Sequence, residues 1–515
     1  MAVELGASRL LAPYFSSSQI VWTIIIGTIM IAMALGNIYG GKTADKDANP
    51  DRLFKRIIFA AIWIGLIPAV GKYVILAITG LLVLTVSTHF LVIAAFAACM
   101  IIFVFPLFLL GTVTPSLVKY TMNNLDDNGR IVGTLGAFNT VGSIIGTFLP
   151  TFVTIPAVGT SITFLIFSGI LLILSGIYFF TVGRQMPGQP RRKPLFFAAV
   201  LLFLLCCICG HSDSFAFWEK NLTYEGESVY NYLQVKETES DVILSTNVMF
   251  GVQSILKKDP GLTGMYYDYA MAAPYMADIS GKSSADILIL GMGTGTYATQ
   301  CRRYFDNVNI EGVEIDGKIV DLSREYFSLD EEVPVTTYDG RAYLQAIDKK
   351  YDVIMVDAYQ DITIPFQMST VEFFSMVKEH LKPNGVMVVN MNMRGQSEGN
   401  INQYLADTIS QVFPSVATVD VERSTNRELF AGDAQMMTLF ERGVAEETNP
   451  ELAAMMKTVQ ASLNMYSPGD LVMTDDKAPV ELLGMQVIDE IIRGELTYYR
   501  SIYEKDGLDG VLNSL

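Results

Sequence analysis

The second half of the chain places a chemically useful group directly after each of four short apolar runs. In chain order these groups are Gly291, Glu314, Asp339 and Asp357. A carboxylate can accept hydrogen bonds from ribose hydroxyls, or it can take up a proton during a reaction. An acidic residue after a strand often only caps the next helix. Three carboxylates and a glycine turn at one sheet edge nevertheless favour a ligand site.

The first of these groups opens a glycine-rich turn, I-L-I-L-G-M-G-T-G-T-Y, which begins at Ile287. Glycine occupies alternate positions in it, at Gly291, Gly293 and Gly295. A strand, a glycine turn and a helix place backbone N–H groups beside a bound ligand. A dinucleotide-binding turn needs its third glycine one position later, where Thr296 stands. Because Glu314 stands where a ribose-binding carboxylate is needed, the pattern favours an adenosyl ligand without a second nucleotide.

Strands and helices are expected to alternate from residue 287 onward. The apolar runs expected to be strands are Ile287–Leu290, Ile310–Ile315, Val333–Tyr338, Val353–Val356 and Val386–Asn390. This alternation predicts a doubly wound, parallel α/β sheet of the Rossmann-like class. Val416–Val421 and Met436–Phe440 are expected to close the sheet as a hairpin. Thr223–Leu244 predicts two or three strands of a small β region ahead of the sheet.

The first half of the chain has the composition of a multi-pass α-helical membrane domain. Five apolar runs are about 20 residues long, enough to cross a bilayer: Ile20–Tyr39, Ile57–Ile78, Leu91–Leu110, Ile131–Val153 and Ile162–Phe180. Leu195–Cys209 is shorter, and whether it crosses stays open. One such run could be a buried core helix, but five in succession predict a membrane protein. Close helix packing is expected at Gly133, Gly136, Gly142 and Gly146.

Composition divides the chain into four parts. These are a transmembrane helical domain (1–210), a small β-rich part (211–286), a Rossmann-like adenosyl-binding domain (287–440) and a helical tail (441–515). Residues 1–210 carry 13 basic and 6 acidic residues, whereas residues 211–515 carry 23 and 47. The acidic balance suits a cationic substrate or a solvated surface, and it argues against nucleic acid. In the tail, the acidic stretch 471–481 is either a helix-capping turn or a place where Asp475 or Asp476 lines a substrate pocket.

The charge pattern and the supply of substrate favour different sides of the membrane for the second half. Loops 40–56, 119–130 and 184–193 hold most basic residues of the first half, which places these loops in the cytoplasm. If Leu195–Cys209 then crosses the bilayer, the acidic half lies outside, away from the cellular adenosyl pool. We favour the cytoplasm, because an enzyme must meet its substrate.

Cysteine and histidine usage excludes several kinds of site. Four of the five cysteines lie in apolar segments of the first half, at Cys99, Cys206, Cys207 and Cys209. Only Cys301 belongs to the second half, and the whole chain has three histidines. These numbers predict no disulfide framework, no metal site and no histidine-based triad.

The second half resembles spermidine synthase, and the layout of the chain resembles bacterial proteins in which a transporter-like membrane domain is fused to such a synthase. The likeness covers residues 221–440. It rests on E-S-V-Y-N at 227–231, G-V-Q at 251–253, Y-Y-D at 266–268, G-M-G-T-G at 291–295, V-E-I-D at 313–316, Y-D-G at 338–340 and V-D-A-Y at 356–359. It implies a methyltransferase-type Rossmann-like fold and no permanently bound cofactor. The implied reaction moves an aminopropyl group from decarboxylated S-adenosylmethionine to a diamine and releases methylthioadenosine.

The resemblance also implies a role for each matched residue. Donor-binding residues would be Gln253 near the thioether, Gly291, Gly293, Thr294 and Gly295 in the turn, Glu314 on the ribose, Asp339 and Gly340 at the adenine, and Asn231, where the family usually has glutamine. Tyr266 and Asp357 would orient and deprotonate the attacking amine, which must be neutral to displace a sulfonium. Acceptor-binding residues would be Asp268, Tyr359, Gln360 and Asp361.

Two positions depart from the family pattern. Thr294 stands where spermidine synthases usually have an aspartate that holds the donor's ammonium group. Gln360 stands where they have an acidic residue for the far end of the diamine, and Asp361, one place later, could substitute for it. A neutral donor pocket tolerates a carboxylate better, so intact S-adenosylmethionine becomes a second candidate donor.

Three functions therefore compete. The leading one is a membrane-anchored aminopropyltransferase acting on putrescine or a related amine. The second is a methyl or alkyl transferase that uses intact S-adenosylmethionine. The third is a non-catalytic adenosyl-binding sensor coupled to the membrane domain. The expected partners are a small-molecule amine and a lipid bilayer, with a homodimer left open and no nucleic acid.

Overall fold

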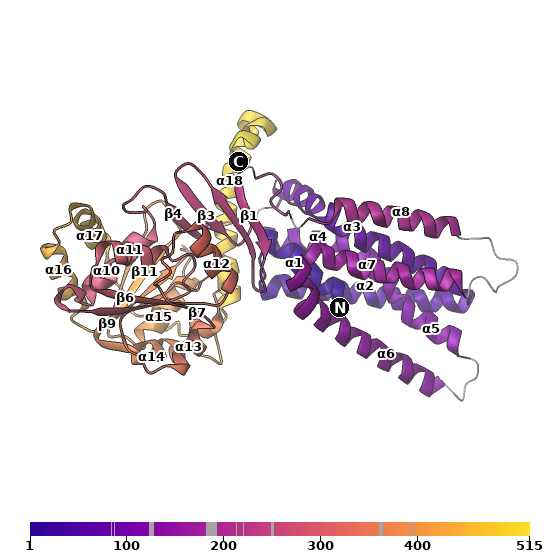
Figure 1. Cartoon of the computed structure of the whole chain (residues 1–515), viewed down its shortest axis with the longest axis horizontal. Helices are drawn as coiled ribbons and strands as arrows, with labels where there is room; N and C mark the ends of the chain where they lie inside the picture. The colour runs from indigo at the N-terminus through magenta and orange to yellow at the C-terminus, as the bar shows by residue number, and fades with distance from the viewer. Residues whose placement is uncertain are drawn as a thin grey trace. The chain divides into compact units, whose positions relative to one another are not determined.

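The chain forms two compact units in a computed structural model (Figure 1). The structure describes residues 1–83, 85–86, 88–122, 128–181, 193–212, 214–219, 221–248, 252–359, 364–392, 394–395 and 397–514. The first unit consists of Met1–Trp218, Glu225–Tyr232 and Leu496–Leu515, and the second of Glu219–Tyr224 and Leu233–Glu495.

The first unit is built from apolar helices. Their bounds are α1 (Ala2–Phe15), α2 (Gln19–Lys46), α3 (Pro50–Val83), α4 (Phe90–Gly111), α5 (Val113–Thr121), α6 (Asn128–Leu149), η2 (Pro150–Thr154), α7 (Ile155–Phe180) and α8 (Lys193–Cys209). Four helical stretches are long and apolar enough to cross a membrane: Gln19–Lys46, Pro50–Val83, Phe90–Thr121 and Asn128–Phe180. The last of these contains two of the five predicted runs. The shorter apolar helix Pro194–Cys209 contains the sixth run, Leu195–Cys209, whose crossing the sequence leaves open.

Close helix packing occurs at other glycines than the sequence predicts. A Cβ atom on Gly36 of α2 would lie 2.2 Å from the Phe108 carbonyl oxygen, and one on Gly111 would lie 2.7 Å from the Met33 oxygen. These two glycines therefore let α2 and α4 approach each other closely, as small residues do in membrane bundles. At Gly133, Gly136 and Gly142, by contrast, no described atom lies within 4 Å of such a Cβ. The expectation of tight packing at those three positions is wrong within the described residues.

A break divides α7 and is held by a carboxylate. Gly159 has φ 80° and ψ 174°, outside the helical region, so a new helical segment begins at Thr160. The Glu227 carboxylate accepts hydrogen bonds from the Thr160 backbone N–H and hydroxyl, both at 2.9 Å. An anionic acceptor satisfies free N–H groups and suits the positive end of a helix dipole. The Arg9 guanidinium also donates to the Ser228 carbonyl oxygen at 3.1 Å. These contacts explain why the turn that carries E-S-V-Y-N belongs to the first unit.

The described residues form two β-sheets. The smaller sheet has the order β1-β2-β3-β4, with β1 (Leu222–Glu227), β2 (Tyr232–Glu237), β3 (Asp241–Ser245) and β4 (Ser254–Lys257). The larger sheet has the order β12-β10-β11-β9-β8-β5-β6-β7. Its strands are β5 (Ala285–Leu290), β6 (Val308–Glu314), β7 (Val335–Thr337), β8 (Tyr351–Val356), β9 (Leu381–Met391), β10 (Ser415–Asp420), β11 (Arg427–Gly432) and β12 (Asn464–Met465).

The larger sheet confirms the predicted Rossmann-like core. Strands β5 to β9 pair in parallel, because each is preceded by a helical crossover. The chain order reverses between β5 and β8, which are neighbours. Ligands of such sheets bind beyond the carboxyl ends of the strands at this switch point.

Helices cover both faces of the larger sheet. The helices that follow the first unit in the chain are α9 (Tyr266–Ala270), α10 (Ala272–Met276), η3 (Ile279–Gly281), α11 (Thr296–Tyr304), α12 (Gly317–Tyr326), α13 (Gly340–Ala346), η4 (Phe366–Met368), α14 (Val371–Glu379), α15 (Ile401–Ser410), α16 (Met436–Glu446), α17 (Pro450–Ser462) and α18 (Val480–Ser514). Figure 1 shows α10 and α11 on one side of the sheet and α13 and α14 on the other. Two covered faces account for the nearly continuous apolar runs of the central strands.

The predicted closing hairpin is half wrong. Strand β10 lies where expected, but Met436–Phe440 begins helix α16 instead of forming a strand. Met436, Phe440 and Val444 are buried at helical spacing, so the apolar residues have a period of four rather than two. The partner of β10 is β11, which pairs with it from Ser415↔Gly432 to Asp420↔Arg427.

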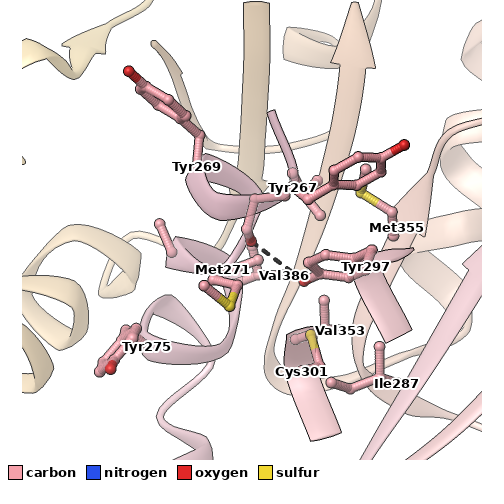
Figure 2. Packing of buried hydrophobic residues seen from close by; sticks show 14 of the residues in the cluster. Tyr267, Tyr269, Met271, Tyr275, Ile287, Tyr297, Cys301, Val353, Met355 and Val386 are labelled. Carbon is pink, nitrogen blue, oxygen red and sulfur yellow. Dashed lines mark hydrogen bonds between the residues drawn. The ribbon is translucent and has the colours of Figure 1, made fainter. Parts of the chain in front are cut away.

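One face of the central strands packs against an aromatic core (Figure 2). Ile287, Val353 and Met355 point from the sheet toward Tyr297 of α11 and the tyrosines of α9. The Tyr297 hydroxyl donates to the Ala270 carbonyl oxygen at 3.3 Å. The core therefore fixes α9, the helix that begins with Tyr266, against the edge of the sheet where the candidate site lies.

Candidate active site

The glycine turn lies at the switch point, and its backbone conformation favours glycine. Gly291, Gly293 and Gly295 have φ values of 86°, 53° and 80°, which favour glycine. A Cβ atom on Gly291 would lie 2.5 Å from the Asp357 carbonyl oxygen, so the chain after β5 touches the chain after β8. The sequence prediction that these two positions share one edge is therefore confirmed by the fold.

Glu314 joins the glycine turn to the end of β6. It is 7% exposed, and its Oε2 accepts a hydrogen bond from the Gly293 N–H at 2.9 Å. Its Oε1 accepts from the Asp316 N–H at 3.1 Å. Burial raises the pKa of Glu314, while these backbone donors oppose the rise. The carboxylate thus lies where a ligand seated on the turn would meet it.

Asp357 follows β8 and is oriented by two donors. The Tyr266 hydroxyl donates to its Oδ2 at 2.6 Å, and the Asn390 amide donates to its Oδ1 at 2.8 Å. Burial raises the pKa of Asp357 to about 7, and the Glu314 charge adds to this effect, whereas the two hydrogen bonds oppose it. A carboxyl group with a pKa near neutrality can both accept and release a proton under cellular conditions. Asp357 remains partly exposed, so a substrate could reach it.

Tyr266 reaches Asp357 from the first turn of α9. Burial raises the pKa of Tyr266 well above its ordinary value, and Asp357 contributes to the same effect, so the hydroxyl stays protonated and donates. Its ring lies 4.0 Å from the Tyr267 ring, centroid to centroid. The Tyr267 hydroxyl in turn donates to Ser254 Oγ at 3.2 Å, at the start of β4. The pair of tyrosines therefore links β4, α9 and β8 around one point.

Thr294 turns its side chain away from solvent. It is 1% exposed, and its hydroxyl lies 3.2 Å from the Thr296 hydroxyl, which donates to the Ile255 carbonyl oxygen at 2.9 Å. The position that is acidic in typical spermidine synthases is thus a neutral, internally bonded group. What this does to donor choice stays a prediction.

Two further predicted donor-binding residues differ in their surroundings. Gln253 directly precedes β4, and its Oε1 is buried without a hydrogen-bond partner among the described residues. Ser254 follows Gln253 in the chain, and its hydroxyl would lie 3.2 Å from a Cβ atom placed on Gly293. Gln253 is therefore next to a residue that contacts the glycine turn. Asn231 precedes β2 in the segment of the first unit, where its N–H donates to Ser228 Oγ at 2.8 Å. Its role in donor binding stays a prediction.

Several predicted residues have structural contacts of their own. Asp268 is fully buried, and its carboxylate accepts from the Thr263 and Gly264 N–H groups at 3.0 and 2.6 Å. Asp339 caps α13 by accepting a hydrogen bond from the Ala342 N–H at 2.8 Å. This is the helix-capping role that an acidic residue after a strand often has. The Tyr359 hydroxyl donates to the Met368 carbonyl oxygen at 3.0 Å. Gly340 begins α13. Gln360 and Asp361 lie outside the described residues.

Two residues near Asp357 escaped sequence reasoning. Asn390 lies near the end of β9, so the rule that picked out Glu314 and Asp357 could have found it. Glu428 lies inside β11, directly opposite Asn390 in the register, and is fully buried. Sequence reasoning did not single out Glu428, because β11 was not predicted as a strand. Acidic residues are also rarely buried without a partner, so a glutamate is normally expected at the surface.

The arrangement as a whole suits a nucleoside ligand beside a proton acceptor. The amides of a glycine turn and the Glu314 carboxylate line one side of the switch point, and the Asp357 carboxyl with its two donors lines the other. A ligand on the turn would therefore present its reactive end close to a group that takes up protons.

Comparison with known proteins agrees with this geometry. Residues 267–423 match the family described as Spermine/spermidine synthase domain. A protein from Bifidobacterium longum (strain NCC 2705), named probable polyamine aminopropyl transferase, is 49% identical over 357 residues, which cover 66% of this chain and 78% of the relative. A polyamine aminopropyltransferase from Vibrio vulnificus (strain CMCP6) is 28% identical over 198 residues, covering 37% of this chain and 65% of the relative.

A solved structure is similar as well. The crystal structure of spermidine synthase from Thermotoga maritima superimposes with a TM-score of 0.39 at 19% identity, covering 47% of this chain and 83% of that one. The extent and identity of the match to the Bifidobacterium longum protein, with the family match to the Rossmann-like core, establish the relationship. An apolar helical region is followed here by a spermidine synthase domain, and the chain belongs to the spermine/spermidine synthase family of polyamine aminopropyltransferases.

Proposed function

We propose that the chain is a membrane-anchored aminopropyltransferase that moves an aminopropyl group from decarboxylated S-adenosylmethionine to a diamine such as putrescine. The observation that carries this proposal is Asp357, a carboxyl group with a pKa of about 7 that two side chains orient beside the glycine turn. Family membership supports aminopropyl transfer as the reaction type. The identities of donor and acceptor are the part proposed here.

The reaction requires a neutral nitrogen and a place for its proton. The amine nitrogen attacks the donor carbon beside the sulfonium, and the new C–N bond forms as the C–S bond breaks. The electron pair of the broken bond stays on sulfur, which leaves as the neutral thioether of methylthioadenosine. The nitrogen gives one proton to Asp357, which Tyr266 and Asn390 hold in a fixed orientation.

The donor would lie along the glycine turn. Each Glu314 oxygen accepts one backbone hydrogen bond and keeps a further lone pair, which the ribose hydroxyls would use. The buried Oε1 of Gln253, which has no partner among the described residues, would meet the thioether end. Asp339 and Gly340 complete the proposed donor site, and Asp268, Tyr359, Gln360 and Asp361 the proposed acceptor site. A donor-binding role of Asn231, which belongs to the first unit, rests on the family resemblance alone.

A second candidate donor is intact S-adenosylmethionine. The observation that favours it is the neutral Thr294, whose hydroxyl lies against Thr296 and offers no negative charge to an ammonium group. With this donor, methyl transfer would give S-adenosylhomocysteine and a methylated acceptor, whereas transfer of the aminocarboxypropyl group would give methylthioadenosine and an acceptor that carries that group. The adenosyl-binding sensor receives no support from membership in an enzyme family.

Anchoring in a bilayer rests on the four long apolar stretches of the first unit. We place the second unit on the cytoplasmic side, where the adenosyl donors are made. The positive-inside rule places loop 184–193 on the same side, so this placement requires that Leu195–Cys209 does not cross the bilayer. A homodimer is compatible with this proposal and is not required by it.

Product analysis tests the proposed function directly. The full-length protein is incubated with each donor and a panel of amines, and the products are identified by mass spectrometry. We expect methylthioadenosine together with an amine enlarged by one aminopropyl group. S-adenosylhomocysteine with a methylated acceptor would instead establish the second candidate, and no product with any acceptor would refute both.

The change Asp357→Asn should remove the proton acceptor and keep the shape of the site. Turnover should fall by about 10²-fold or more while donor affinity hardly changes. Since only the ionised carboxylate accepts a proton, the wild-type rate should fall as the pH drops through about 7. The defect of the variant should shrink at high pH, because more amine then arrives already neutral. Equal pH–rate profiles for the two proteins would exclude Asp357 as the base.

The change Glu314→Gln should weaken binding of both the donor and methylthioadenosine, which share the ribose. The loss of a charged acceptor predicts roughly 1.5–3 kcal/mol, or about 10–150-fold in Kd, measured by calorimetry. Glu311→Gln is the matched control, since Glu311 lies in the middle of the same strand, three residues before Glu314, and pairs with Lys349 at 3.0 Å. Equal affinities for the Glu314 variant and this control would remove Glu314 from the donor site.

Anchoring is tested by cell fractionation. The protein should stay in the membrane fraction after washing with high salt and alkaline carbonate, because apolar helices rather than surface charges would hold it there. Release into the supernatant by either wash would contradict a transmembrane anchor.

A further inference from the structure

Glu428 of β11 is a buried acid without a partner. It is 0% exposed, and neither carboxylate oxygen has a hydrogen bond in the described parts of the chain. The other fully buried acids behave differently: Asp268 accepts three hydrogen bonds, and Asp407 accepts from the Tyr466 hydroxyl and two backbone N–H groups. Burial of an unpaired carboxyl group costs stability, which makes Glu428 a candidate for a functional role.

The sheet register places Glu428 on the same face as the groups around Asp357. Strands β11 and β9 are antiparallel, with Glu428 directly opposite Asn390. Side chains of directly opposed residues point to the same face of a sheet. Asn390 donates to Asp357 Oδ1, and the Asn426 amide, two residues before Glu428, donates to the Asn390 oxygen at 2.8 Å. Glu428 therefore lies one strand beyond the residue that orients the proposed base.

The neighbours of Glu428 offer no positive charge. On this face of the sheet, α9 contributes Tyr266, Tyr267 and Tyr269 to the core, and α11 contributes Tyr297, which Figure 2 shows pointing toward α9. No lysine, arginine or histidine forms an ion pair with Glu428 among the described residues. Burial raises the pKa of Glu428 well above its usual range, and the Asp357 charge adds to the effect. A cation supplied by a ligand would reverse it and allow Glu428 to ionise.

Building on the proposed transfer to a diamine, we propose that Glu428 binds the second ammonium group of the acceptor. Asp357 then receives the proton of the attacking nitrogen, while the other nitrogen keeps its proton and pairs with Glu428. Two carboxyl groups on one face, separated by Asn390, would hold the two ends of one short molecule. This assignment supplies the charge that Gln360 lacks at the position usually used for the far end of the diamine.

The proposal predicts which acceptors the site prefers. A diamine should bind about tenfold or more tightly than a monoamine of the same carbon length, because only the diamine brings a charge to Glu428. The comparison is made by calorimetry with 1,4-diaminobutane and butylamine on the full-length protein in detergent, with methylthioadenosine present at saturation. Binding is measured without turnover, and product analysis of the wild type reports separately on the proposed reaction.

Substitutions then assign the preference to one side chain. Glu428→Gln keeps the size and removes the charge, so the preference for the diamine should fall to about twofold or less, with butylamine affinity hardly changed. Glu428→Asp keeps a carboxylate and should retain part of the preference. Glu422→Gln is the matched control, since Glu422 is exposed in the turn of the same hairpin, and this variant should keep the full preference.

The outcomes separate the two proposals. If the wild type makes an aminopropylated diamine and Glu428→Gln still prefers the diamine, the role of Glu428 is refuted while the proposed function stands. If the wild type itself does not distinguish the two amines, the role of Glu428 is refuted whatever the variants do. Loss of the preference in Glu428→Gln, with a melting temperature at or above that of the wild type, supports the proposal, since a buried acid kept for binding destabilises the fold. If Glu428→Gln cannot fold, the Glu428→Asp variant decides. A Glu428→Asp protein that folds but does not prefer the diamine over butylamine refutes the role of Glu428.

Discussion

The contact between Gly291 and the backbone of Asp357 is the constraint on which the site depends. Strands β5 and β8 are neighbours only because the chain order reverses between them, and their ends then meet at a distance that excludes any side chain on residue 291. A larger residue would push the glycine turn away from the acid that follows β8. The amides of the turn, the Glu314 carboxylate bonded to Gly293, and the Tyr266–Asp357 pair all take their positions from this contact.

Much of this architecture could be predicted from the chain, and the reasons differ from part to part. Strands β5 and β8 are buried along nearly their whole length and stand out as short apolar runs, so their existence and the groups after them were predictable. The pairing of Tyr266 with Asp357 was not available from spacing, because 91 residues separate them. That pairing came from the family resemblance, and the hydrogen bond now observed agrees with it.

The failures have physical causes of their own. The period of Met436, Phe440 and Val444 identifies a helix only if the window extends past residue 440, and a five-residue run looks like a strand. Strand β11 was missed because it starts with Arg427 and Glu428, residue types expected at the surface. The glycines of α6 were expected to pack closely, yet the close contacts occur between α2 and α4, since a pattern of small residues does not specify its partner. A residue such as Glu428, which breaks the rule for buried charge and is proposed to belong to the site, is where reasoning from sequence should fail.

The position of the switch point also bears on how this fold could diversify. Strands β5, β6 and β7 lie on one side of it, with the groups assigned to the nucleoside. Strands β8, β9 and β11 lie on the other, with Asp357, Asn390 and Glu428. Mutations in the outer hairpin could therefore alter which amine is accepted without touching the half that is proposed to hold the adenosyl group. Descendants of one ancestral sheet could inherit the same donor chemistry unchanged while exploring new acceptors, because the two tasks evolve on opposite sides of a single boundary.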